Sequence, residues 1–143
     1  MIFATLVTVV ALSASPQPQA TTFYSYLAGE TWEFRVARPD LAQAPAWRAT
    51  DDAPPLPPRA AIRSARSMLQ RLLASAPKWE VHRVSLQPMA SVPDSWVYLV
   101  EFTSPLLPPL APGVVGSHIG SQVTLVVLMN GKAVAPVRTT HSR

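Results

Sequence analysis

The stretch 58–76, PRAAIRSARSMLQRLLASA, decides the fold, because here the apolar residues recur at a convincing helical spacing. At about 100° per residue these positions gather on one face of a helix. The residues on this face are Ile62, Ala65, Leu69, Leu72, Leu73 and Ala76. Such a face needs a surface to pack against, and the runs on either side of it resemble β-strands. The sequence therefore predicts one helix laid on an antiparallel sheet.

The segments that flank this helix have the composition of β-strands. Residues 31–37 place Trp32, Phe34 and Val36 on one side and polar residues on the other, which is typical of a half-buried strand. Residues 95–103 are apolar on both sides, which indicates a central strand. The predicted strands are residues 31–37, 79–86, 95–103, 123–129 and 132–138.

Asn130-Gly131 is the strongest hairpin signal in the chain and joins the last two predicted strands. It predicts a type I′ turn, in which both central residues need positive φ. Pro136 cannot donate a ladder hydrogen bond, so the strand that contains it is expected at a sheet edge. The predicted fold class is α+β: one helix packed on a four- to five-stranded antiparallel sheet, in the order β-α-β-β-β-β.

This order of elements resembles the cystatin-like topology, in which one helix lies across a coiled antiparallel sheet. Small exported bacterial domains of the PepSY type are broadly similar. The resemblance covers residues 31–138 by element order alone. The inhibitory QxVxG motif of true cystatins is absent, because Gln122-Val123-Thr124 lacks the glycine, so protease inhibition is not implied. A likeness of fold does not determine function.

Residues 2–12, IFATLVTVVAL, form an apolar run that is followed by small residues and PQPQA. This is the order of an export signal with its cleavage region, although no Lys or Arg precedes the run. Cleavage between Ser13 and Ala20 would place the protein in the periplasm or outside the cell. The alternatives are a membrane anchor and a buried N-terminal strand; the run is shorter than the roughly 20 apolar residues of a spanning helix.

The rest of the chain, residues 21–143, is expected to form a single domain. It contains no Cys, so disulfides and thiolate metal sites are excluded. The net charge of +4 comes mostly from scattered Arg, whereas a nucleic-acid site would need a basic cluster. The chain has 16 Pro, about double the average share of roughly 5%. These prolines predict long loops at 38–57 and 104–121.

The first of these loops offers two interpretations of its prolines. Residues 54–58 spell overlapping PxxP, as in polyproline ligands. A stiff lead-in with Pro58 at the first helical position is the favoured interpretation. Trp47, in the middle of the loop, is expected to hold it against the core.

Motifs for catalysis and for cofactor binding are missing from the sequence. The spacing of His82, His118 and His141 matches no metal-ligand pattern. Residues 116–120 look like a nucleophile elbow, but His118 stands where the central serine belongs. No catalytic, cofactor-binding or metal-ligating residue is therefore assigned, no cofactor is expected, and the protein is not expected to be an enzyme.

Two surfaces are candidates for partner binding. Arg59, Arg63 and Arg66 form one line along the predicted helix, beside its apolar stripe. This line is either a contact for an acidic partner or an anionic membrane surface, or a solvated flank whose Arg stems cover the margin of the core. The second surface is the apolar loop 106–119, which either folds under the sheet or binds a partner or a second copy. Its candidate residues are Leu107, Leu110, Val114, Val115 and Ile119.

Taken together, these patterns favour a small exported binding domain without catalytic activity, whose ligand or protein partner the sequence does not identify. The alternative is a structural or assembly protein of the cell envelope that self-associates. A hydrolase ranks third.

Overall fold

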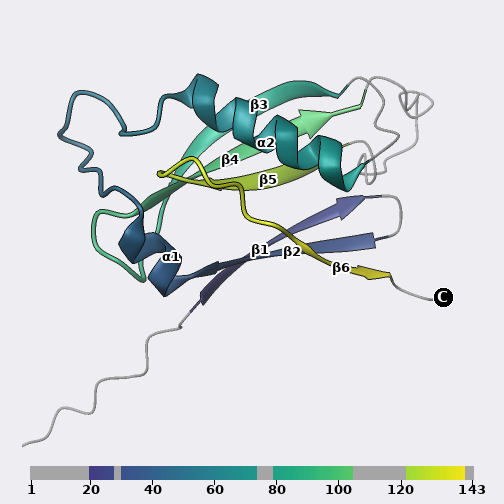
Figure 1. Ribbon diagram of the computed structural model, residues 1–143, viewed down its shortest axis with the longest axis horizontal. Coiled ribbons are helices and arrows are strands. Elements are labelled where there is room, and N and C mark those ends of the chain that lie inside the picture. The colour runs from purple at the N-terminus through teal and green to yellow at the C-terminus, as the bar shows by residue number, and fades with distance from the viewer. Residues whose placement is uncertain (1–19, 28–29, 74–78, 105–121, 141–143) are drawn as a thin grey trace, which may run out of the picture.

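The computed structural model describes residues 20–27, 30–73, 79–104 and 122–140 (Figure 1). The predicted α+β class is confirmed, with antiparallel strands and one main helix. None of the described helices has the length and apolar character that a membrane crossing requires. The elements are β1 (Ala20–Leu27), β2 (Glu30–Ala37), α1 (Arg38–Gln43), α2 (Pro58–Leu72), β3 (Glu80–Pro88), β4 (Trp96–Thr103), β5 (Gln122–Leu128) and β6 (Val137–Thr140).

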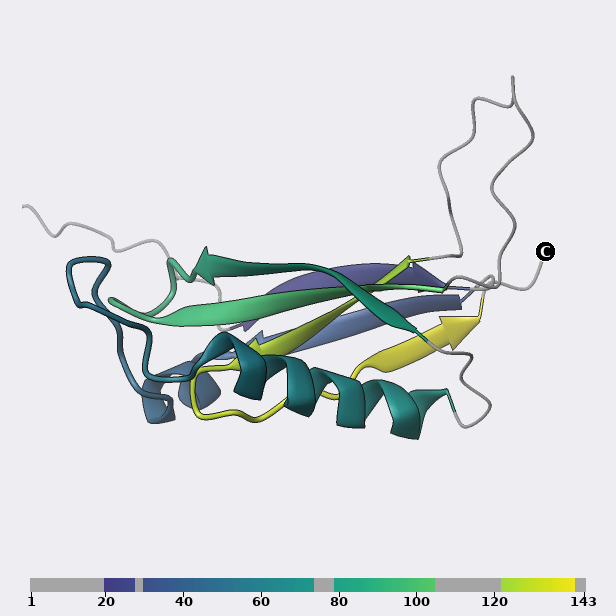
Figure 2. The same ribbon diagram turned by 90° about the horizontal axis from the view of Figure 1, so that it is seen from above.

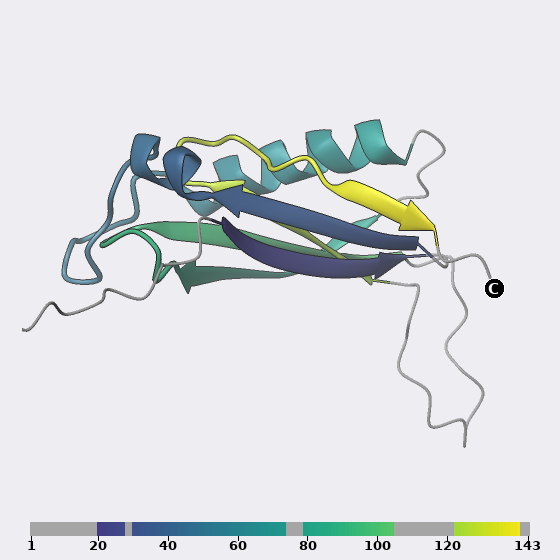
Figure 3. The same cartoon turned by 90° about the horizontal axis from the view of Figure 1, so that it is seen from below.

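The described strands form two three-stranded antiparallel sheets, β1-β2-β6 and β3-β4-β5. The predicted single sheet of four or five strands is therefore wrong, and so is the order β-α-β-β-β-β. The chain has an additional strand, β1, before the first predicted one, and β6 pairs with β2. Figure 3 shows β1, β2 and β6 side by side, with β6 nearer to α2.

The edge of β5 that faces away from β4 pairs with none of the described strands, and this separates the two sheets. At one end of that edge, Val126 and Leu128 form backbone hydrogen bonds of 2.9 Å with the segment that returns from the hairpin. At the other end, the backbone N–H of Thr124 donates to the hydroxyl of Ser25 on β1 at 3.0 Å. A side chain thus replaces a ladder bond where the two sheets meet. Because Ser25 is buried, water does not easily replace its hydroxyl as the acceptor for the N–H of Thr124.

Replacing Ser25 by alanine is expected to lower the free energy of unfolding by about 1–3 kcal/mol, because it leaves the N–H of Thr124 without its acceptor. Chemical denaturation measures the change. Ser85→Ala on β3 is the matched control, since no side-chain hydrogen bond is found for Ser85 among the described residues. Equal effects of the two substitutions would mean that the hydroxyl of Ser25 does not join the sheets.

Helix α2 covers one face of β3-β4-β5 (Figure 2). It buries Ala61, Ala65, Met68 and Leu69, and Ile62, Leu72 and Leu73 pack partly buried beside them. The buried face is therefore turned toward Ala61 and Met68 relative to the predicted one. The helix also ends at Leu72, earlier than the predicted residue 76, and the N–H of Leu73 donates to the carbonyl of Leu69. Residues 74–78 lie outside the described part.

The predicted irregular crossing at 38–57 is helical at its start. Helix α1 has Pro39 in its first turn, where a missing N–H is tolerated, and it buries Leu41. After α1 the chain is irregular as far as α2. Trp47 packs edge-on against Trp96, with ring centroids 5.0 Å apart and an interplanar angle of 63°. Trp47 therefore holds the loop against β4, in agreement with the prediction that this residue fixes the loop to the core.

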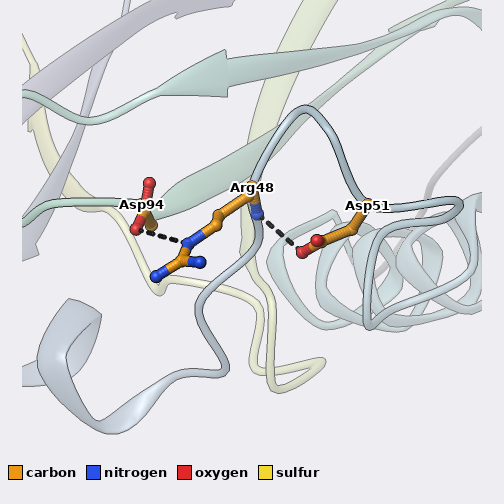
Figure 4. Close-up of polar contacts among 3 residues, drawn as sticks. All are labelled: Arg48, Asp51 and Asp94. Carbon is orange, nitrogen blue, oxygen red and sulfur yellow. Dashed lines mark hydrogen bonds and ion pairs between the residues drawn. The ribbon is translucent and has the colours of Figure 1, made fainter.

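Polar contacts of Arg48 hold the same loop (Figure 4). Its backbone N–H donates to the carboxylate of Asp51 at 3.0 Å, and its Nε lies 3.4 Å from the carboxylate of Asp94. The carbonyl of Asp94 accepts the N–H of Trp47 at 2.8 Å. Asp94 has φ +54°, a left-handed conformation that Asp tolerates better than most residues. The contacts thus tie the loop to the turn before β4.

Tyr98 on β4 closes the end of this loop, because its hydroxyl donates to the carbonyl of Leu56 at 2.7 Å. Burial raises the pKa of the Tyr98 phenol. The folded-state pKa therefore lies above the unfolded value of about 10. The stability that this difference contributes is fully present below the unfolded pKa and is lost as pH rises through the folded pKa.

Tyr98→Phe is expected to cost about 0.5–1.5 kcal/mol at neutral pH, through the lost hydrogen bond. It should also reduce the loss of stability in alkaline solution, since no buried phenol remains at this position to ionise. Urea melts at neutral pH and at several alkaline values measure both effects. If wild type and variant lose the same stability at high pH, another group causes the alkaline transition.

The hairpin after β5 forms, but its turn differs from the predicted type I′. The N–H of Gly131 donates to the carbonyl of Leu128 at 2.9 Å, and Gly131 has φ +85°. Asp94 is the non-glycine residue with positive φ in the described chain, so Asn130 does not adopt the conformation that type I′ needs. The geometry fits a three-residue loop with glycine in the left-handed position. The segment 131–136 that follows is called the return segment below.

Candidate functional site

A cleft of about 400 Å³ lies between α2 and the return segment, which run close together in Figures 1 and 2. We call it the basic cleft, because three of its described lining residues are cationic and none of them is acidic. Its lining residues are Arg63, Ser64, Ser67 and Arg71 from α2, and Gly131, Lys132 and Ala133 from the return segment.

The wall formed by α2 follows from helical spacing. Arg63, Ser67 and Arg71 are separated by four residues each, so they line up along one side of the helix. Ala61, Ala65, Met68 and Leu69, on the buried face of the same helix, anchor this wall against the sheet. The opposite wall depends on Gly131, whose left-handed conformation turns the chain back from β5.

The cations of the cleft differ in how far they are already neutralised. The ammonium of Lys132 lies 3.2 Å from the carboxylate of Asp40 on α1, and both side chains are well exposed. Arg71 contacts the sulfur of Met68 at 3.7 Å, which is a weak acceptor. Arg63 has no hydrogen-bond or ion-pair partner among the described residues. The α2 wall thus carries two positive charges that no carboxylate of the described chain pairs with.

The three predicted Arg residues of the helix lie in different surroundings. Arg63 lines the basic cleft, whereas Arg59 is exposed outside it. Arg66 turns to the other flank of α2, where Nη1 donates to the carbonyl of Trp79 at 3.0 Å. Its guanidinium also lies 5.6 Å from the ring centroid of Phe102. Its stem and head therefore cover the margin of the core rather than a shared contact line.

The other predicted surface is the apolar loop 106–119. Leu107, Leu110, Val114, Val115 and Ile119 lie outside the described residues, as do residues 1–19 of the predicted export signal.

Most residues of the cleft were not predicted from the sequence. Arg71 continues the spacing of Arg63 along the helix, so this residue could have been found from periodicity. Lys132 carries no such signal, because nothing local indicates that the return segment packs beside α2.

Outside the cleft, the described polar groups do not assemble into a metal site. Among residues 20–27, 30–73, 79–104 and 122–140, no group of three or more His, Asp or Glu side chains is placed to hold an ion. His82 lies 3.9 Å from Glu101 on an exposed part of β3-β4. The arrangement of the basic cleft itself suits the binding of an anion, through guanidinium, ammonium and hydroxyl donors.

Comparison with known proteins finds no match to a family model, to a curated protein or to a solved structure.

Proposed function

We propose that this chain is a small exported binding domain without catalytic activity, and that its basic cleft holds an anionic group of the ligand or partner. The observation that carries this proposal is the unpaired guanidinium of Arg63, which lines the cleft together with Arg71 and two serine hydroxyls. Guanidinium groups offer several fixed N–H donors to an anion, and charge-assisted hydrogen bonds are stronger than neutral ones. Export is inferred from the apolar run near the N-terminus.

The alternative, an envelope protein that self-associates, is supported by a different surface. Tyr24, Tyr26 and Val137 are each more than half exposed. Tyr24 pairs with Glu33 on β2, and Glu33 pairs with Val137 on β6, so these side chains share the outer face of their sheet. Sedimentation of the purified protein tests this alternative. The alternative is favoured if the wild-type protein is a dimer and the double variant Tyr24→Ser/Tyr26→Ser is a monomer. A monomeric wild-type protein favours the binding domain.

Pairing through a sheet edge receives less support. The edge of β3 away from β4 has no strand partner among the described residues, but a bulge between Val81 and Arg83 interrupts it and Pro88 ends it. Bulges, prolines and charges on an edge are features that discourage edge-to-edge pairing.

Titration with inorganic phosphate tests the anion site. At low ionic strength we expect backbone NMR shifts concentrated in residues 63–71 and 131–133. The double variant Arg63→Gln/Arg71→Gln should weaken the binding about tenfold or more, because the loss of one charge-assisted bond costs roughly 1.5–3 kcal/mol. Arg59→Gln removes one positive charge from the same helix outside the cleft, and it should weaken binding clearly less than the double variant does. If phosphate causes the same NMR shifts in the double variant as in the wild type, the basic cleft is not the binding site.

A further inference from the structure

The return segment presents an unused backbone edge at the basic cleft. The carbonyl of Lys132 accepts the N–H of Leu128, and the N–H of Val134 donates to the carbonyl of Val126, each at 2.9 Å. Since backbone groups alternate along an extended chain, the N–H and C=O of Ala133 point away from β5. They have no hydrogen-bond partner among the described residues, and Ala133 lines the cleft. One wall therefore offers a donor and an acceptor to an incoming backbone.

The opposite wall repeats at the spacing of an extended peptide. Arg63 and Arg71 are eight residues apart, which corresponds to about 12 Å along a helix axis. An extended chain advances about 3.3 Å per residue, so side chains four residues apart lie about 13 Å apart on the same side. Carboxylates at two such positions can reach the two guanidinium groups. The side chain midway between them lies opposite Ser67, which offers a hydroxyl.

We propose that the basic cleft binds an extended acidic segment of another polypeptide. The backbone of this segment pairs with the N–H and C=O of Ala133, and two carboxylates four residues apart meet Arg63 and Arg71. The inference rests on the proposed function and specifies the partner. Lys132 contributes less to the attraction, because Asp40 already neutralises it.

Other anionic ligands fit these observations less well. A bilayer surface offers no ordered backbone that could pair with the N–H and C=O of Ala133. A single phosphate would engage neighbouring cations but would leave the backbone of Ala133 unused. The combination of separated cations and an unpaired backbone edge favours a peptide, as in the addition of a strand to an exposed edge.

The test uses a short, fluorescently labelled peptide with blocked ends and glutamate at alternate positions, separated by threonine. Its matched control carries glutamine in place of glutamate. At low ionic strength, fluorescence anisotropy should show that the glutamine peptide binds about tenfold more weakly or worse. Arg63→Gln/Arg71→Gln should weaken the glutamate peptide by a similar factor, whereas Arg59→Gln, outside the cleft, should weaken it clearly less.

A third peptide tests the backbone contact without altering the protein. N-methylation of the central residues of the glutamate peptide keeps its charge and removes its backbone donors, and we expect binding to weaken severalfold. Equal binding of the methylated and unmethylated peptides would overturn the extended mode.

Two further outcomes separate this inference from the proposed function. Phosphate shifts in the cleft, together with equal binding of the glutamate and glutamine peptides, would overturn the acidic-segment partner and leave the anion site standing. Absence of both phosphate and peptide binding would overturn both. A third outcome is that the protein binds vesicles rich in phosphatidylglycerol but no peptide, and that the double variant no longer binds the vesicles. This outcome would overturn the peptide and indicate a membrane surface as the partner.

Discussion

Replacing Trp32 by alanine is expected to lower the free energy of unfolding by about 3–5 kcal/mol, the range for truncating a large aromatic residue in a core. Trp32 is fully buried on the inner face of β2. Its indole N–H donates to the carboxylate of Glu30 at 3.1 Å, so the polar atom of this buried ring has a partner. The substitution removes the ring volume from the hydrophobic cluster that contains residues of both sheets. Denaturant melts of the purified variant measure the change.

Tyr24→Ala is the matched control for Trp32→Ala. Tyr24 lies on the neighbouring strand β1, but its side chain is 56% exposed, so its removal leaves no cavity. We expect its effect to stay below about 1 kcal/mol, since it loses mainly cross-strand contacts. Hydrogen exchange adds a second measurement: Trp32→Ala should accelerate exchange in β3-β4-β5 as well, because both sheets contribute to the same cluster. Acceleration confined to β1-β2-β6 would show that the sheets unfold separately.

Leu69→Ala is expected to destabilise the protein by about 2–5 kcal/mol, which is the range for a buried leucine. Leu69 is 2% exposed on the face of α2 that packs against the sheet. The magnitude depends on how far the surrounding side chains close the cavity, and the neighbouring Met68 is flexible enough to fill part of it.

Arg63→Ala, six residues earlier on the same helix, is the comparison for Leu69→Ala. Arg63 is exposed and makes no ion pair with the described residues, so the substitution should change stability by less than about 0.5 kcal/mol. It should nevertheless impair anion binding. Equal destabilisation by the two substitutions in urea melts would mean that the buried face of α2 is assigned wrongly.

Sequence periodicity located most of the elements, because it reports which side of each segment is buried. The spacing of Ala65 and Leu69 marked the helix, and the alternation of Trp32, Phe34 and Val36 marked β2. The first strand was missed since Tyr24 and Tyr26 face solvent while Ser25 is buried, which reverses the expected polarity of the alternation. Propensity for a strand was present there, but the side of burial could not be seen.

The candidate site was less predictable than the elements. The spacing of Arg residues indicated a basic side of α2, yet Arg63 lines the cleft whereas Arg66 contacts Trp79 and Phe102. Whether a long side chain reaches solvent, a carbonyl or an aromatic ring depends on what the neighbouring strands place beside it. For Arg66, the carbonyl of Trp79 and the ring of Phe102 decide the direction.

The sequence by itself determined the α+β fold class, the position of α2 and the β-strand character of the segments around it. These properties depend on residues that lie within one or two helical turns or strand repeats of each other. Only the tertiary structure decided which edges pair. Ser25 meets Thr124 across 99 positions, and Lys132 meets Asp40 across 92. Such contacts depend on which backbone edges remain unpaired once each apolar face is buried. That competition placed β6 on β2 and the return segment beside α2, and it thereby formed the basic cleft.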